Sequence, residues 1–198
     1  LPGVEVKISE GGEILVRAGT VMNGYFKHPQ TTAEAFADGW FRTGDSGCLD
    51  PDGCLRITDR LKDLIKTSAG KYVAPQQLEM AVAGDPFVEQ VFVLGDGRRF
   101  VTALVVPNFE VLEKYAQAGG IAFASREALC AHPAVLALYR ERIDARTKDL
   151  SRHEQVKRFA LLARPFTLEE GDLTPTLKLM RRRVAEKHAA LIESLYRD

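Results

Sequence analysis

Three short stretches of the chain hold side chains of the kinds that bind or transfer phosphorylated ligands. The first is Trp40-Phe41-Arg42-Thr43-Gly44-Asp45, in which an acidic residue follows a glycine at the end of an expected strand. A carboxylate in this position can accept hydrogen bonds from both hydroxyls of a cis-diol, which is how acidic residues hold a ribose. A bare Thr-Gly-Asp equally suits an ordinary turn, and taken alone the stretch favours the turn.

The second stretch runs from Thr58 to Pro75 and contains Arg60, a permanent cation whose donors can reach a ribose or phosphate oxygen. It also contains Thr67-Ser68-Ala69-Gly70-Lys71, a loop of small residues whose backbone can approach a ligand closely. This loop is not a P-loop, because the spacing Gly-x4-Gly-Lys-Ser/Thr is missing. The charged run at 59–63 marks a domain boundary, and a solvated loop is the simplest interpretation of it.

The third stretch is Leu173-Thr174-Pro175-Thr176-Leu177-Lys178. We expect Lys178 on a turn before the last helix, which places a mobile ammonium group at the tip of a loop. Such a cation can neutralise charge that develops on a phosphoryl or acyl centre. Any exposed lysine has the same appearance, so Lys178 by itself does not identify a site.

The elements that must position Asp45 are predicted to be β-strands. Apolar and charged residues alternate in Val4–Ile8, and Pro51-Asp52-Gly53 has strong turn chemistry, so Cys48 and Cys54 flank a hairpin and not a metal site. A short helical patch is expected at Thr31–Phe36, capped by Thr31 or Thr32. Further strands are expected at 13–17, 40–43 and 54–58.

After residue 64 the pattern changes to mixed helices and strands. Pro75 and Pro133 are expected at the first positions of helices, and Gly95-Asp96-Gly97-Arg98 joins two apolar runs into a hairpin. The last helix carries its apolar stripe at spacings of three and four, with His188 packed on it. The expected helices are 76–82, 108–117, 133–150 and 180–195, and the expected strands are 88–94, 100–106 and 158–163.

Composition excludes several classes of protein. The chain has 27 basic and 27 acidic residues, so it has no net field that would favour nucleic acid. It holds no apolar run of about 18 residues that would predict a transmembrane helix. Its three cysteines are not paired for chelation, which argues against a zinc site and indicates buried or free thiols in a reducing compartment.

Together, in this order, the motifs resemble the C-terminal part of an adenylate-forming enzyme of the acyl-CoA synthetase superfamily. Val21–Tyr25, Phe36 and Gly39–Asp45 are similar to a segment late in the family's large domain, and Leu173–Lys178 is similar to the terminal lysine motif of long-chain fatty acyl-CoA synthetases. Asp59–Lys66 resembles the family's hinge and Ala69–Pro75 the loop that follows it.

The resemblance implies a role for each matched residue. Lys178 would be the catalytic lysine of adenylation, and Asp45 and Arg60 would hold the ribose of ATP and of the acyl-adenylate. Lys62 would be the hinge about which the small domain turns between the two half-reactions. The loop formed by Ser68, Ala69, Gly70 and Lys71 would then replace Lys178 and line the path of the CoA thiol.

The expected fold class is α+β with two parts. Residues 1–59 would be the C-terminal β-subdomain of the large AMP-binding domain, and residues 60–198 a mobile lid domain with a small sheet flanked by helices. Since the chain begins Leu1-Pro2-Gly3-Val4 without an initiator Met, we expect it to come from within a longer protein. The phosphate loop, the acyl tunnel and the site for Mg²⁺ would precede Leu1, so the chain alone would be inactive.

The implied parent enzyme is an AMP-forming long-chain fatty acid–CoA ligase that uses ATP and CoA. Its partners would be the fatty acid, ATP, CoA and the N-terminal adenylation domain of the same chain, in the cytoplasm, with peripheral membrane contact left open. Two alternatives stand beside this one. The chain could be the lid of an adenylating enzyme that transfers its acyl group to a carrier protein, or a non-catalytic interaction module of the same fold.

Overall fold

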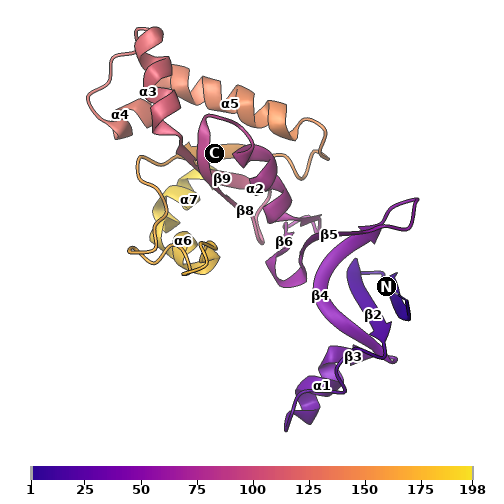
Figure 1. Cartoon of the computed structure of the whole chain (residues 1–198). Coiled ribbons are helices and arrows are strands. Elements are labelled where there is room, and N and C mark those ends of the chain that lie inside the picture. Colours follow the sequence, from indigo (N-terminus) through magenta and orange to yellow (C-terminus); the bar gives the residue numbers. More distant parts are fainter. Residues whose placement is uncertain (1, 198) are drawn as a thin grey trace. The chain divides into compact units, whose positions relative to one another are not determined.

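The computed structural model describes residues 2–197, with the backbone alone at Lys62. The chain forms two compact units, Leu1–Leu64 and Ile65–Asp198 (Figure 1). Helices and small sheets occur together, so the expected α+β class is confirmed. Among the described residues, no helix is both long enough and apolar enough to cross a membrane.

The first unit is built on a five-stranded antiparallel sheet. Its strands lie in the order β1-β2-β4-β3, and β5 pairs with β4. The alternation that predicted the first strand is borne out, since half-buried and exposed positions alternate along β1. The strands are β1 (Val4–Ile8), β2 (Glu13–Ala18), β3 (Phe36–Ala37), β4 (Trp40–Leu49) and β5 (Leu55–Arg60).

The hairpin expected between Cys48 and Cys54 is confirmed as the β4–β5 connection. The side chain of Asp50 accepts hydrogen bonds from the N–H groups of Asp52 (3.1 Å) and Cys54 (2.7 Å). Gly53 completes the turn with φ +80°, a conformation that glycine adopts without strain. Both cysteines are exposed and free.

The helical patch begins earlier than expected and has a different cap. Helix α1 spans Pro29–Ala35, with His28 at the N-cap. Neither Thr31 nor Thr32 caps it, because Pro29 already supplies the fixed φ of a first helical position. Thr32 Oγ1 instead donates to the His28 carbonyl (2.9 Å) and accepts from the Tyr25 N–H (2.9 Å).

The composition of the charged run at 59–63 suggested a solvated loop, and this expectation is wrong. Strand β5 continues through Arg60, and a short 3₁₀-helix, η1 (Leu61–Asp63), follows it directly. Asp59 is only 4% exposed and its carboxylate accepts from the Arg60 N–H (2.7 Å). Strand pairing therefore overrides the charge of the run, and the two compact units separate between Leu64 and Ile65.

The second unit contains a three-stranded sheet in the order β10-β9-β8. The predicted hairpin is confirmed, since β8 (Val88–Leu94) and β9 (Thr102–Pro107) are antiparallel and joined through Gly95–Arg98. Strand β10 (Arg158–Leu161) runs parallel to β9, which only the fold could establish. A separate ribbon pairs β6 (Ile65–Lys66) with β7 (Tyr72–Val73).

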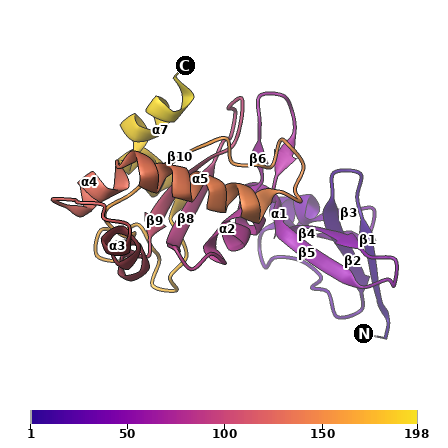
Figure 2. The ribbon, with the colours of Figure 1, turned by 90° about the horizontal axis from the view of Figure 1, so that it is seen from above.

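Helices cover both faces of this sheet, with α2 and α5 on one side and α6 and α7 on the other (Figures 1 and 2). Both prolines predicted at first helical positions stand there. The five-residue α4 was not predicted because it is too short to show a period. The helices are α2 (Pro75–Ala83), α3 (Phe109–Ala118), α4 (Arg126–Cys130), α5 (Pro133–Thr147), α6 (Arg181–Lys187) and α7 (Ala189–Tyr196).

The last helix is two helices, contrary to the single helix expected. His188 leaves helical geometry at φ −104° and ψ 20°. Helical hydrogen bonds nevertheless continue, since the His188 N–H donates to the Val184 carbonyl and the His188 carbonyl accepts from the Ile192 N–H. Its ring packs edge-on against Phe166, so the packed histidine that we expected is observed. Val184 and Ile192 are both buried, so the apolar stripe continues across the break. The spacing of apolar residues therefore gives no sign of the break.

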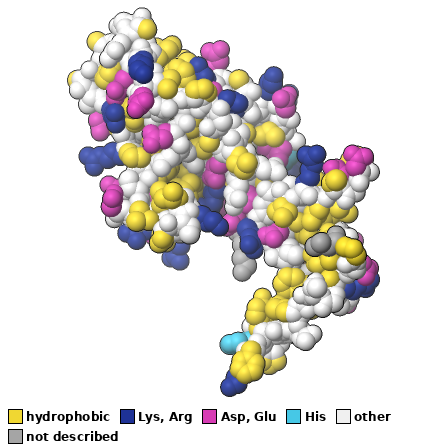
Figure 3. Space-filling model, in the orientation of Figure 1, with side chains coloured by type: hydrophobic (Ala, Val, Ile, Leu, Met, Phe, Trp, Pro, Cys, Tyr) yellow, Lys and Arg dark blue, Asp and Glu magenta, His cyan; other side chains and the backbone are white. Residues whose placement is uncertain are grey.

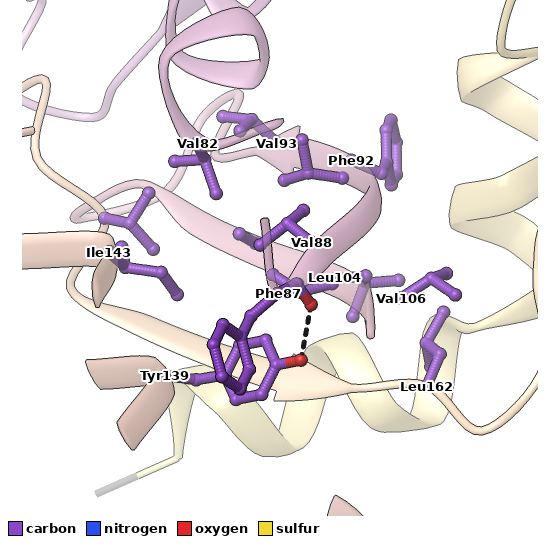
Figure 4. Packing of buried hydrophobic residues seen from close by; sticks show 14 of the residues in the cluster. Val82, Phe87, Val88, Phe92, Val93, Leu104, Val106, Tyr139, Ile143 and Leu162 are labelled. Carbon is purple, nitrogen blue, oxygen red and sulfur yellow. Dashed lines mark hydrogen bonds between the residues drawn. The ribbon is translucent and has the colours of Figure 1, made fainter. Parts of the chain in front are cut away.

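The core of the second unit joins the sheet to α2 and α5 (Figure 4). Every residue of β9 is buried, as expected of a central strand covered on both faces. Tyr139 of α5 is fully buried, and its hydroxyl donates to the Phe87 carbonyl at 2.6 Å. This hydrogen bond contributes on the order of 1 kcal/mol and fixes α5 against the start of β8.

Candidate functional site

Asp45 lies in a bulge of strand β4. Glu13 of β2 pairs with Ser46 and Leu15 with Arg42, so Thr43–Asp45 face the single residue Ile14. Gly44 has φ +71°, and Thr43 Oγ1 donates to the Ile14 carbonyl (2.8 Å) and accepts from the Asp45 N–H (3.1 Å). Bulges re-aim side chains in this way, and here the bulge fixes the backbone from which the Asp45 carboxylate projects.

The sheet brings Asp45 and Arg60 together, as their proposed shared ligand requires. They are register partners on β4 and β5, and Arg60 Nε lies 3.0 Å from Asp45 Oδ1. The Arg60 side chain is 64% exposed and that of Asp45 24% exposed, so both remain accessible to a ligand. A carboxylate that accepts beside a guanidinium that donates can bind the hydroxyls of a diol.

Glu13 is a residue of this region that the sequence did not mark. It is 7% exposed, and its carboxylate accepts from the Gly44 N–H (3.1 Å) and from Arg42 Nε (3.0 Å). It therefore fixes the backbone directly before Asp45. An acidic residue at the start of a strand has no distinctive spacing, and only the pairing of β2 with β4 carries it to this place.

Lys178 lies on a small hairpin before α6, as predicted. Leu173 and Leu179 form an antiparallel bridge, and the Thr174 N–H donates to the Lys178 carbonyl (2.8 Å). The Leu177 N–H donates to the Thr174 carbonyl (2.8 Å), which closes a turn with Pro175 at its second position. Lys178 itself is exposed, so its ammonium can reach an anion outside the hairpin.

The loop Ser68–Lys71 is exposed and joins β6 to β7. Thr67 closes it, with its N–H donating to the Lys71 carbonyl (2.9 Å), and Gly70 adopts φ +73°. The loop rests on the β8–β9 turn, because the Ser68 N–H donates to the Arg98 carbonyl at 2.8 Å. The backbone of this exposed loop is thus accessible to a ligand at close range.

The predicted residues fall into two groups. Asp45 and Arg60 are paired in the first unit, whereas Lys178 and the loop at 68–71 occupy different loops of the second unit. Lys62 has its backbone in η1, and its side chain lies outside the described part of the chain.

The described residues hold no close cluster of potential metal ligands. Within the described range 2–197, no three His, Cys, Asp or Glu side chains gather closely enough to hold a metal ion. The expected Mg²⁺ site in a preceding segment remains a prediction.

A family model described as the AMP-binding enzyme C-terminal domain matches residues 62–198. The chain is 42% identical to the long-chain-fatty-acid–CoA ligase FadD15 of Mycobacterium tuberculosis over 99% of this chain and 33% of that protein. It is 46% identical to the putative fatty-acid–CoA ligase fadD11 of the same organism, over 99% of this chain and 34% of that one. The chain thus spans about a third of the length of these curated relatives.

A solved structure shares the fold over nearly the whole chain. It is the A-PCP didomain of carboxylic acid reductase from Segniliparus rugosus in complex with AMP, which matches with a TM-score of 0.70. The sequence identity is 30%, and the match covers 98% of this chain and 27% of that one.

Proposed function

Because the chain belongs to the family of AMP-binding enzyme C-terminal domains, we propose that it forms the C-terminal part of an ATP-dependent long-chain fatty acid–CoA ligase. The observation that carries the proposal is 42% identity to such a ligase across 99% of the chain, which includes every motif discussed above. The proposed partners are the fatty acid, ATP, CoA and a preceding adenylation domain.

In the first half-reaction the fatty acid carboxylate attacks the α-phosphate of ATP. The new bond joins the carboxylate oxygen to phosphorus, and pyrophosphate leaves. Negative charge gathers at the phosphorus as two anions meet, and a placed cation stabilises that charge. We assign this role to Lys178, whose exposed position on a hydrogen-bonded hairpin supports it. Asp45 and Arg60 hold the ribose.

In the second half-reaction the CoA thiol attacks the acyl carbonyl of the acyl-adenylate. A carbon–sulfur bond forms and the thiol proton is lost to solvent. The bond between the acyl carbon and the phosphate oxygen breaks, and AMP leaves with its electron pair. We assign the Ser68–Lys71 loop to the thiol path and Lys62 to the hinge that exchanges the loop for Lys178. Domain rotation of this kind lets one lid serve two chemistries.

Replacing Lys178 by alanine tests the proposal in the ligase that contains this chain. We expect Lys178→Ala to lower fatty acid-dependent exchange of pyrophosphate into ATP about 100-fold, the usual cost of one lost charge-stabilising group. Thioester formation from supplied acyl-adenylate should stay within about threefold, because Lys178 is absent from that step.

Lys114→Ala is the matched control, since Lys114 is also an exposed lysine of the second unit but lies on α3, away from the hairpin. It should leave both rates unchanged. Equal adenylation by Lys178→Ala and the unchanged enzyme would refute the assignment of Lys178 and favour the non-catalytic module.

Transfer to a carrier protein is a second candidate function. The structural match to an A-PCP didomain favours it, because that didomain joins the matching fold to a carrier domain. AMP release measured with CoA and with a phosphopantetheinylated carrier protein separates the two candidates. Release that depends on CoA alone supports the ligase, and release that requires the carrier supports the alternative.

A further inference from the structure

The hairpin that bears Lys178 is joined at its base to an ion pair between the buried Asp172 and the partly exposed Lys187. Asp172 immediately precedes the hairpin and is 0% exposed. Its Oδ2 lies 2.7 Å from Lys187 Nζ on α6, and Lys187 also pairs with Glu170. Lys187 is thus held by two carboxylates from the segment that leads into the hairpin.

Backbone hydrogen bonds connect this ion pair to Lys178. The Asp172 N–H donates to the Thr167 carbonyl (2.9 Å), and the Asp172 carbonyl accepts from the Met180 N–H (2.8 Å). One residue further in, Leu173 bridges Leu179. Asp172 and Met180 therefore close the base of the hairpin, and Lys178 lies two residues from that closure.

The Lys187 ammonium group resists loss of its proton. Burial alone would lower the pKa of Lys187, but its hydrogen bonds to Asp172 and Glu170 outweigh burial and raise that pKa above its ordinary value. Asp172 Oδ1 is buried without a hydrogen-bond partner among the described residues. Asp172 Oδ2 accepts from the Thr167 N–H (3.4 Å) and from Lys187 Nζ (2.7 Å). Removal of Lys187 would take a cationic partner from this buried carboxylate and should loosen the segment that holds it.

We propose that Asp172 and Lys187 are positioning residues that hold the Lys178 hairpin in register for adenylation. This inference rests on the proposed function, because it assigns a support to the lysine of that reaction. The Lys178 side chain has four rotatable bonds, so its ammonium group can sample many positions. The backbone position of the hairpin decides which region those positions cover. Misplacement of a reacting group by about 1 Å can lower a rate about 100-fold.

The experiment compares Lys187→Met with Lys187→Arg. Met keeps the apolar stem and removes the charge, whereas Arg keeps a cation that can pair with both carboxylates. Hydrogen exchange on the 198-residue chain is the first readout. In Lys187→Met, exchange of the peptide 173–180 should rise at least about tenfold, while β8 and β9 keep their protection.

The half-reactions of the complete ligase are the second readout. Lys187→Met should lower adenylation about tenfold or more and leave thioester formation from acyl-adenylate within about twofold. Lys187→Arg should restore adenylation to within about threefold of the unchanged enzyme. A purely structural role would lower both half-reactions together, and that result would overturn the proposal.

Two further variants complete the design. Lys114→Met makes the same substitution at the exposed lysine of α3 and should change neither readout. Asp172→Asn keeps the shape of the carboxylate and decides the question if Lys187→Met does not fold, since it should show the same selective loss of adenylation. If Lys178→Ala lowers adenylation but neither Lys187→Met nor Asp172→Asn does, the inference fails and the proposed function stands. If Lys178→Ala has no effect, the proposed function itself fails.

Discussion

At the scale of single residues, burial separates thiols that the sequence could not distinguish. Cys48 and Cys54 are exposed, whereas Cys130 on α4 is 6% exposed. Burial, reinforced by the nearby charge of Glu127, raises the pKa of the Cys130 thiol to about 11. The thiolate is the reactive form, so Cys130 is protected both by access and by protonation.

We therefore expect iodoacetamide at pH 8 to modify Cys48 and Cys54 of the native chain and to leave Cys130 unmodified. Mass spectrometry should show two adducts in native buffer and three in denaturant. Since the pKa of Cys130 is raised to about 11, labelling of Cys130 in the native chain should increase only as the pH approaches 11. Labelling of Cys130 as fast as the other two at pH 8 would contradict the buried position of this side chain.

At the scale of elements, the bulge in β4 determines where Asp45 projects. Gly44 has φ +71°, and a Cβ built there would meet nothing within 4 Å. Any cost of substitution at Gly44 is therefore conformational and not steric. The neighbouring Gly47 differs, because a Cβ there would lie 2.5 Å from the Arg56 carbonyl oxygen.

Gly44→Ala should lower the free energy of unfolding of the first unit by about 1 kcal/mol, because L-residues with a Cβ disfavour this conformation. Asparagine visits the left-handed region more readily, so Gly44→Asn should cost less than Gly44→Ala. Urea unfolding of the two variants measures the difference. An alanine variant as stable as the original chain would show that the bulge is not strained by a side chain.

At the scale of the whole molecule, the two units have unequal cores. Ile14 and Leu15 are the buried hydrophobic residues among those described in the first unit, while the second unit holds the continuous cluster of the core. The first unit also exposes large apolar side chains, and yellow side chains are gathered over it in Figure 3. These exposed residues are Tyr25, Phe26, Leu49, Leu55 and Ile57. They suit contact with the preceding domain that we propose.

We predict that the 198-residue chain opens unevenly in solution. Amides of β8 and β9 should exchange at least about 100-fold more slowly than those of β1 and β2, because local stability follows buried apolar contact. Hydrogen exchange followed by mass spectrometry measures this ratio peptide by peptide. Equal protection of both units would indicate a single cooperative fold and contradict the prediction.

Local patterns were sufficient for much of this molecule. The hairpin through Gly95–Arg98, the helix starts at Pro75 and Pro133 and the turn that bears Lys178 before the last helical segment were all predicted and observed. Turn and cap chemistry acts between residues a few positions apart, so the order of residue types carries it. The Pro29 start of α1 shows the limit of this approach, because two local signals competed and the proline prevailed.

The sequence by itself determined the family motifs and most of the elements, because side-chain periodicity and turn residues are local properties. Only the tertiary structure decided which distant groups meet. Glu13 reaches Gly44 across 31 positions, and Lys187 reaches Asp172 across 15, through strand registration and helix packing that no short pattern encodes. The break at His188 was likewise visible only in the structure, where the His188 ring packs against Phe166, because the apolar stripe of the sequence runs through the break without change.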